Sequence, residues 1–304
     1  MKIKNYLILN LVLIAFTLAP LAGKLDAQTL LLEYKFNGSG TTALNTAGTI
    51  SGGDMTFYDT TGAAANLYGA TGSGVSGAAG DLAFNNTAST GMGTTGTGGR
   101  AQTSYNAGIQ TLTSFTLTGW FKTDSTSSIG GNATLINNLN GTNGFHLFSS
   151  ASGVLALNVD GTSVTSTGTT AYAGTQQWVF FAVTYDSTTS VAKFYVGDTA
   201  GNLSLNVSRT LNAGATNDNS GSISMANLAG TSIRPFDGYL DDMRVFGATS
   251  GSLGALDMTA IQGIMTGDIS NIPEPSSAAA FIAGGSAFIA GFIKLRRRNF
   301  CANL

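Results

Sequence analysis

Residues 177–197, QWVFFAVTYDSTTSVAKFYVG, contain the pattern that decides the fold class. Gln177–Tyr185 is apolar on both faces of an extended chain, which predicts a strand in the middle of a sheet. Asp186–Ser190 has the composition of a turn, and Val191–Val196 predicts the strand that follows it. Two strands joined by so short a turn pair antiparallel, so this stretch indicates a β-protein.

Short strands separated by turns continue on both sides of this hairpin. Phe115–Lys122 alternates, so that its Phe and Leu residues share one face while Trp120 lies on the opposite, threonine-rich face. Asp160-Gly161 marks another hairpin turn, and Leu253–Met265 predicts one short helix. Further strands are predicted at Leu30–Phe36, Met55–Tyr58, Leu82–Phe84, Thr134–Asn138, Gly144–Ser149, Val154–Val159, Ser163–Ser166, Ile223–Met225 and Gly238–Phe246. Many short strands at this spacing predict an all-β sandwich or jelly roll of antiparallel sheets.

The N-terminus has the layout of a secretory signal peptide. Lys2 and Lys4 precede the apolar run Tyr6–Leu21, and small residues follow up to Ala27. We therefore predict a signal peptide at residues 1–27, with cleavage after Ala27. The alternative is a retained membrane anchor, although the apolar run is short for a bilayer span.

The C-terminus combines three features in its last 35 residues, 270–304. Pro273-Glu274-Pro275 comes first, then an apolar segment from Ala278 to Ile293, then a basic cluster containing Arg296, Arg297 and Arg298. With Ser276 and Ser277 the segment reaches the length of a transmembrane helix, and the arginines hold their end on the cytoplasmic side. A buried core helix is the alternative, which the terminal position and the polycationic end disfavour.

This tail resembles the PEP-CTERM sorting signal of Gram-negative bacteria that produce exopolysaccharide. The resemblance implies an exosortase, a membrane protease or transpeptidase, as a partner that recognises the tail. It also implies export through the inner membrane, transient anchoring by the C-terminal helix, and final release to the cell surface or the extracellular space.

The body of the chain is mildly acidic and has no thiol. Between the two end segments, seven Lys and Arg residues stand against fourteen Asp and Glu residues, so no basic face for nucleic acid is expected. The sole cysteine, Cys301, lies beyond the apolar tail, which excludes an internal disulfide in the body. About 240 residues without disulfides are enough for one domain with its own core.

The body resembles the laminin-G-like, concanavalin A-like jelly roll. The residues that carry the resemblance are Trp178–Asp186, KFYVG at Lys193–Gly197 and RPFDGYLDDMRVFG at Arg234–Gly247. The likeness is strong in the last third and weak from Thr41 to Gly99. It implies one domain over residues 28–269, built from two face-to-face antiparallel sheets, and a role in binding glycans or proteins.

Glycosidases of this family cut with a Glu-x-Asp-x-Glu strand, in which one carboxylate attacks and another donates a proton. The whole chain has two glutamates, Glu33 and Glu274, and Glu274 belongs to the tail. Asp241 and Asp242 are adjacent, so a regular strand would place their side chains on opposite sides. The sequence therefore predicts no enzyme. A glycan hydrolase or lyase that uses aspartates from separate strands is the alternative.

The sequence gives little support for a metal site or a catalytic triad. His146 is the only histidine, and alternation places it with Phe148 at a sheet surface, as an ordinary surface or groove residue rather than a catalytic one. Related jelly rolls carry a structural calcium held by a carboxylate that matches Asp241 and by backbone carbonyls, here of Phe36–Gly38. The alternative is that Asp241 accepts hydrogen bonds from local backbone N–H groups.

Glycan binding requires aromatic side chains and polar partners on an open face. The sequence offers Trp120, His146 and Tyr172 as ligand-binding candidates, with core packing as the alternative for Trp120. We expect an exported, non-catalytic module that binds exopolysaccharide, another glycan or a protein. A structural matrix protein without a defined ligand is a further alternative.

Overall fold

The computed structural model describes residues 28–47, 49–104, 107–124, 130–168, 176–217 and 221–267. All of them belong to a compact unit, Gln28–Pro273. The expected signal peptide, the Pro-Glu-Pro motif, the apolar segment and the arginines lie outside the described residues, as does Tyr172. Within the described ranges, no helix has both the length and the apolar character to cross a membrane.

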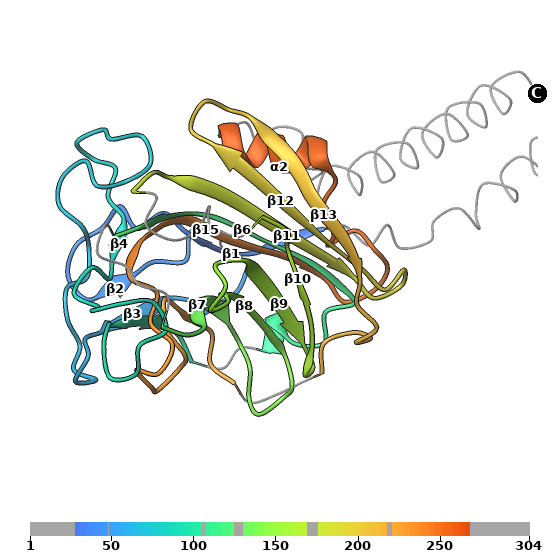
Figure 1. Ribbon diagram of the computed structural model, residues 1–304, viewed down its shortest axis with the longest axis horizontal. Helices are drawn as coiled ribbons and strands as arrows, with labels where there is room; N and C mark the ends of the chain where they lie inside the picture. Colours follow the sequence, from blue (N-terminus) through green and yellow to red (C-terminus); the bar gives the residue numbers. More distant parts are fainter. Residues whose placement is uncertain are drawn as a thin grey trace, which may run out of the picture. The chain divides into compact units, whose positions relative to one another are not determined.

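Two antiparallel sheets form the body, as the sequence predicted (Figure 1). Sheet A has the strand order β1-β15-β6-β11-β12-β13, and β4 also pairs with β15. Its strands are β1 (Thr29–Tyr34), β4 (Phe84–Asn85), β6 (Ser114–Thr123), β11 (Val179–Asp186), β12 (Val191–Asp198), β13 (Leu203–Thr210) and β15 (Gly238–Ala248). The quoted stretch is confirmed as the centre of this sheet, because β11 pairs with β6 on one side and with β12 on the other.

Sheet B has the order β10-β9-β8-β7-β14-β5-β3-β2 and faces sheet A. Its strands are β2 (Thr42–Ala43), β3 (Met55–Tyr58), β5 (Arg100–Gln102), β7 (Ala133–Asn137), β8 (Phe145–Ser149), β9 (Leu155–Val159), β10 (Thr162–Thr165) and β14 (Ser224–Met225). A 3₁₀ turn, η2 (Ala107–Ile109), precedes β6. The expected hairpin joins β9 to β10, with Asp160 and Gly161 both at positive φ, as a tight turn of this kind requires.

Alternation in β6 and β8 builds the core between the sheets. Phe115, Leu117 and Phe121 point inward from β6, and Phe145 and Leu147 point inward from β8. The rings of Phe115 and Phe145 lie 5.2 Å apart across the two layers. Burial of these apolar side chains supplies the main stabilisation of a domain that has no disulfide.

A second core lies on the other face of sheet A, which we call the helix-covered face. Helix α2 (Met258–Thr266) packs there through Ile261, Ile264 and Met265, against Phe180 and Trp120. The helix begins at Asp257, whose carboxylate accepts a hydrogen bond from the N–H of Ala260, and ends at Gly267 in a left-handed conformation. The predicted helix is therefore confirmed, in its C-terminal part.

Strand β13 was not predicted, although Leu203, Leu205 and Val207 alternate with polar residues; all of its side chains are half-exposed to exposed. It is the edge of sheet A and lies beside the edge strand of sheet B. There the Arg209 guanidinium Nε donates to the Thr165 carbonyl at 3.0 Å. The sequence pattern, apolar on both faces, also predicts Trp178 in the core; it instead lies just outside β11 and is half-buried against the second core.

Candidate functional site

A groove of about 730 Å³ opens on the helix-covered face of sheet A. Six separate segments line it: the loop around residues 75–81, strand β6, the turn 198–201 between β12 and β13, the end of α2 at 265–267, the residue Asn37 after β1, and Asp242 on β15. We call it the Trp120 groove. Its lining includes Asn37, Asp81, Trp120, Asp198, Asp242 and Met265.

Trp120 reaches the groove from the middle of β6. Its neighbours on the adjoining strands are Asp241 of β15 and Phe180 of β11. The Phe180 ring lies 5.2 Å away in an edge-on arrangement, and only 4% of Trp120 is exposed. The sequence placed Trp120 on the threonine-rich face of β6, and α2 packs against this part of the sheet. The residue therefore both packs in the second core and lines the groove.

Asp241 lies beneath the groove and is almost fully buried. One carboxylate oxygen accepts the N–H of Val75 at 3.0 Å, and the other accepts the N–H of Asp242 at 2.8 Å. Burial raises the pKa of Asp241 to about 8, and the neighbouring Asp242 carboxylate adds to the rise. Asp241 therefore tethers the groove loop to β15.

The expectation that Asp241 and Asp242 face opposite sides is wrong. The pairing of β15 with β6 shifts register between Asp241 and Arg244, and Asp242 has a φ of 48°. Such a bulge adds a residue to one strand and breaks the alternation of side chains. As a result Asp242 lines the groove, while Asp241 bonds to the loop that walls it.

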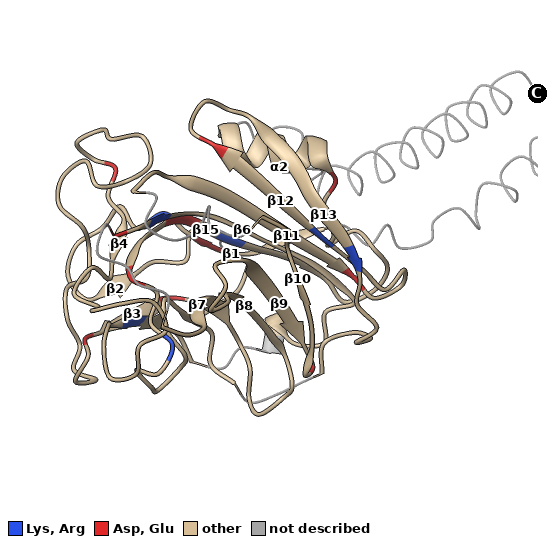
Figure 2. Ribbon diagram, in the orientation of Figure 1, with Lys and Arg blue, Asp and Glu red and all other residues tan. Residues whose placement is uncertain are grey.

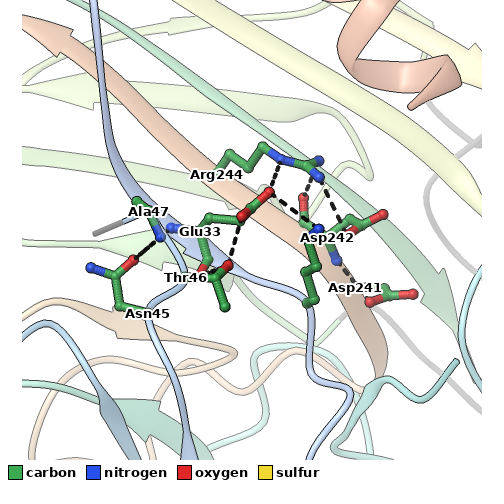
Figure 3. A network of polar contacts seen from close by, with 8 residues as sticks. Glu33, Asn45, Thr46, Ala47, Asp241, Asp242 and Arg244 are labelled. Atoms are coloured by element: carbon green, nitrogen blue, oxygen red, sulfur yellow. Dashed lines mark hydrogen bonds and ion pairs between the residues drawn. The ribbon is translucent and has the colours of Figure 1, made fainter. Parts of the chain in front are cut away.

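A polar network joins Asp242 to the first strand (Figure 3). The Arg244 guanidinium donates through Nε to Glu33 at 2.9 Å, and its Nη2 lies 3.5 Å from Asp242. The Thr46 hydroxyl donates to the other Glu33 oxygen at 2.6 Å. Burial raises the pKa of Asp242, and Arg244 opposes that rise. The pKa of Glu33 is lowered, because hydrogen bonds from Thr46 and Arg244 outweigh its burial.

The other two groove carboxylates shape turns. Asp81 accepts the backbone N–H and the hydroxyl of Ser76, both at 2.7 Å, which closes the 74–81 loop. Asp198 accepts the N–H groups of Ala200 and Asn202, which shapes the β12–β13 turn. Charged residues are sparse over the fold (Figure 2), so three acids in the lining of one groove distinguish it from the rest of the surface.

The calcium expectation meets an unfavourable donor set. Both Asp241 oxygens already accept amide N–H groups, and the Asn37 side chain accepts the N–H of Leu82. Over the described ranges, no three His, Cys, Asp or Glu side chains are grouped as metal ligands. These contacts favour the backbone-acceptor interpretation of Asp241. Calcium binding stays a prediction, which a loss of thermal stability on chelation would support.

His146 is remote from this groove. It lies on β8, where Phe145 and Leu147 on either side of it point into the core, so its ring is on the outer face of sheet B. Its Nε2 lies 3.0 Å from the Thr134 hydroxyl, and its ring stacks on Phe148 at 4.5 Å. Burial and the nearby Arg234 lower its pKa to about 3, so the ring is neutral. With 1% of the residue exposed, it offers a ligand no surface.

An aromatic pair that was not predicted from the sequence lies beside the groove. Trp178 and Tyr239 lie 6.4 Å apart, and the Lys122 ammonium lies over both rings at 5.0 and 4.6 Å. Lys122 and Tyr239 are register partners, two residues along the strands from Trp120 and Asp241. The alternation of β6 placed Lys122 with Trp120, but only the pairing of β15 with β6 shows that Tyr239 joins them.

The comparisons with known proteins agree with this architecture. Domain 4 of AbnA, a GH43 extracellular arabinanase from Geobacillus stearothermophilus solved with arabinotriose, matches with a TM-score of 0.52 and 14% identity. The match covers 79% of this chain and all of that domain. The botulinum neurotoxin serotype D binding domain matches with a TM-score of 0.48 and 15% identity, covering 80% of this chain and 52% of that one.

This chain thus spans about half the length of the neurotoxin binding domains it matches. A search of curated proteins gave no match. The family model of the concanavalin A-like lectin/glucanases superfamily, a laminin-G type, matches residues 95–250. That range covers half of the chain and includes β6–β15, the strands that form most of both sheets. The protein belongs to the concanavalin A-like lectin/glucanases superfamily.

Proposed function

We propose that the Gln28–Pro273 unit is a non-catalytic carbohydrate-binding module and that the Trp120 groove is its binding site. The groove itself carries the proposal. It combines an apolar wall, in which Trp120 is largely buried, with carboxylate and amide side chains at a size that suits a small glycan segment. Sugar rings present apolar C–H faces and hydroxyl donors; Val75, Met265 and the exposed part of Trp120 match the first, and Asp242 or Asn37 matches the second. The bound arabinotriose of AbnA domain 4 shows that a domain of this fold is compatible with a sugar ligand.

The contacts of the carboxylates at the groove favour ligand binding over cleavage of a glycosidic bond. A glycosidase needs two accessible carboxyl groups that flank the scissile bond. Asp241, whose raised pKa would suit a proton donor, has 1% exposure and gives both oxygens to backbone N–H groups. Asp242 is more accessible, but its carboxylate forms an ion pair with Arg244 at 3.5 Å. We therefore place the hydrolase or lyase alternative second, and a matrix protein without a ligand third.

Blocking the groove with a large side chain tests the proposal. Ala200 is exposed at the groove rim, so Ala200→Trp obstructs the groove without entering the core. Ala63 is exposed in a loop beside sheet B, and Ala63→Trp is the matched control. On a panel of polysaccharides we expect wild type and Ala63→Trp to bind the same glycan, and Ala200→Trp to lose at least about tenfold in affinity.

Three results of that panel would contradict the proposal. Release of shorter oligosaccharides by purified wild type would establish the enzyme alternative. Retained binding by Ala200→Trp would place the site elsewhere. Absence of binding to every glycan would leave the matrix protein as the better description.

We also propose that residues 1–27 direct export and that the 270–304 tail is an exosortase signal. The support is the order of Pro273-Glu274-Pro275, an apolar segment and Arg296–Arg298 in the sequence. We expect mass spectrometry of the cell-surface or secreted protein to find a mature chain that begins after Ala27 and lacks the apolar segment. Recovery of the intact tail on that protein would contradict the sorting proposal.

A further inference from the structure

We propose that the Trp120 groove selects glycans with free amino groups, such as de-N-acetylated hexosamine units. This inference rests on the proposed function and adds the class of ligand. An amino sugar combines an apolar ring face with an ammonium group, and the groove offers a separate partner for each.

The charge of the groove is of one sign. Its charged lining residues are Asp81, Asp198 and Asp242, and its described lining contains no Lys or Arg. Arg244 lies close by: its Nε donates to Glu33, and its Nη2 lies 3.5 Å from Asp242. It therefore balances part of the Asp242 charge, whereas no ion pair among the described residues involves Asp81 or Asp198. A concave site lined by one sign of charge concentrates ligands of the opposite sign.

The end of α2 adds to this negative potential. Met265, Thr266 and Gly267 line the groove, and they are the C-terminal residues of the helix. The C-terminal end of a helix carries a partial negative charge, which basic residues in its last turn usually balance. The last turn of α2 has no basic residue. A ligand ammonium would take the place of that missing cation.

Accessibility places the ammonium near Asp242 and Asp198. The Asp242 side chain is 36% exposed, and Asp198 is exposed on the β12–β13 turn. The apolar part of the lining, Val75, Trp120 and Met265, remains for the C–H face of the sugar ring. An N-acetylated unit would bring a neutral amide to the same carboxylates and would lose the charge-assisted hydrogen bond that an ammonium group makes there.

Oligosaccharides that differ only in N-acetylation test this selectivity on the Gln28–Pro273 unit. The probes are glucosamine hexamers and N-acetylglucosamine hexamers, each in β-1,4 and β-1,6 linkage, with calorimetry in the presence of a chelator. We expect the amino form to bind at least about tenfold more tightly in one linkage, and raised salt to weaken it.

Charge-neutral variants connect the preference to the groove. Asp198→Asn keeps an oxygen to accept from the turn amides, and we expect it to weaken glucosamine binding by about fivefold. Asp59→Asn is the control, because Asp59 also closes an exposed turn through N–H groups, beside sheet B. Any of three results would overturn the inference. These are equal affinity for both hexamer types, equal effects of Asp198→Asn and Asp59→Asn, and loss of binding on chelation. Tight binding of a neutral glycan that Ala200→Trp abolishes would overturn the selectivity and leave the proposed function standing.

Discussion

Replacing Glu33 with Gln tests the ion pair that joins β1 to β15. The Glu33 and Arg244 side chains are 11% and 8% exposed, and the Oε1–Nε distance is 2.9 Å. Removing one partner from a buried pair typically costs about 3–5 kcal/mol, because the other charge stays buried. Gln retains the acceptor for Thr46, and Arg244 retains Asp242 at 3.5 Å. We therefore expect a loss at the low end, about 3 kcal/mol.

Lys35 provides the matched control for this change. Its ammonium lies 4.0 Å from the same Glu33 oxygen, but half of its side chain is exposed. An exposed pair contributes less than about 1 kcal/mol, so Lys35→Gln should have little effect. In urea titrations of the Gln28–Pro273 unit the two variants should differ clearly. The melting temperature of Glu33→Gln should fall by about 6–12 °C, the shift that a loss of about 3 kcal/mol gives in a domain of this size.

The pH dependence gives the same pair a second test. The folded pKa of Glu33 is lowered below the ordinary value of 4.5, so its stabilisation is present above that value. It is lost as the pH falls through the folded pKa. The stability gap between wild type and Glu33→Gln should therefore close in acid. A loss in Glu33→Gln no larger than in Lys35→Gln, or a gap that persists in acid, would refute this account of the ion pair.

Three further predictions concern buried positions. The pKa of Asp241 is raised from 3.8 to about 8, so wild type should lose stability relative to Asp241→Asn as the pH rises between these two values; a parallel pair of curves in urea titrations would contradict this. The pKa of His146 is lowered to about 3, so wild type should lose stability relative to His146→Gln as the pH falls below 6.5, and a pH-independent difference would show that the ring titrates normally. Gly119→Ala places a Cβ against the Met243 sulfur and should cost about 1–3 kcal/mol, whereas Gly80→Ala meets nothing within 4 Å and should be neutral; equal melting temperatures would disprove the close packing at β6.

The centre of the fold could be predicted from sequence because burial acts on every residue there. In β6 apolar residues alternate with threonines, and in β11 both faces are apolar, so both patterns are clear and the observed bounds lie within two residues of the predicted ones. Strands β2, β5 and β13 were not predicted. The side chains of β13 are exposed or half-exposed on both faces, and β2 and β5 span only two or three residues. Their position depends on pairing with strands that are distant in the sequence.

The groove could be predicted only in part. Alternation gave the face on which Trp120 lies, but the acids that surround it come from two turns and a bulge. Neither the fold-back of the 74–81 loop onto Asp241 nor the left-handed conformation of Asp242 follows from local pattern. His146 shows the converse. Its position on the sheet surface followed from alternation, whereas its burial depends on Arg234, 88 residues further along the chain.

The central claim is that a glycan binds in the groove beside Trp120, and the two tryptophans of the chain allow a direct measurement. Their indole N–H groups give two signals in a ¹⁵N-correlated NMR spectrum, which Trp178→Phe assigns. On titration with the glycan selected from the panel, the Trp120 signal should shift progressively to saturation, at the same affinity that calorimetry reports. A Trp120 signal that stays in place while the glycan binds would contradict the claim.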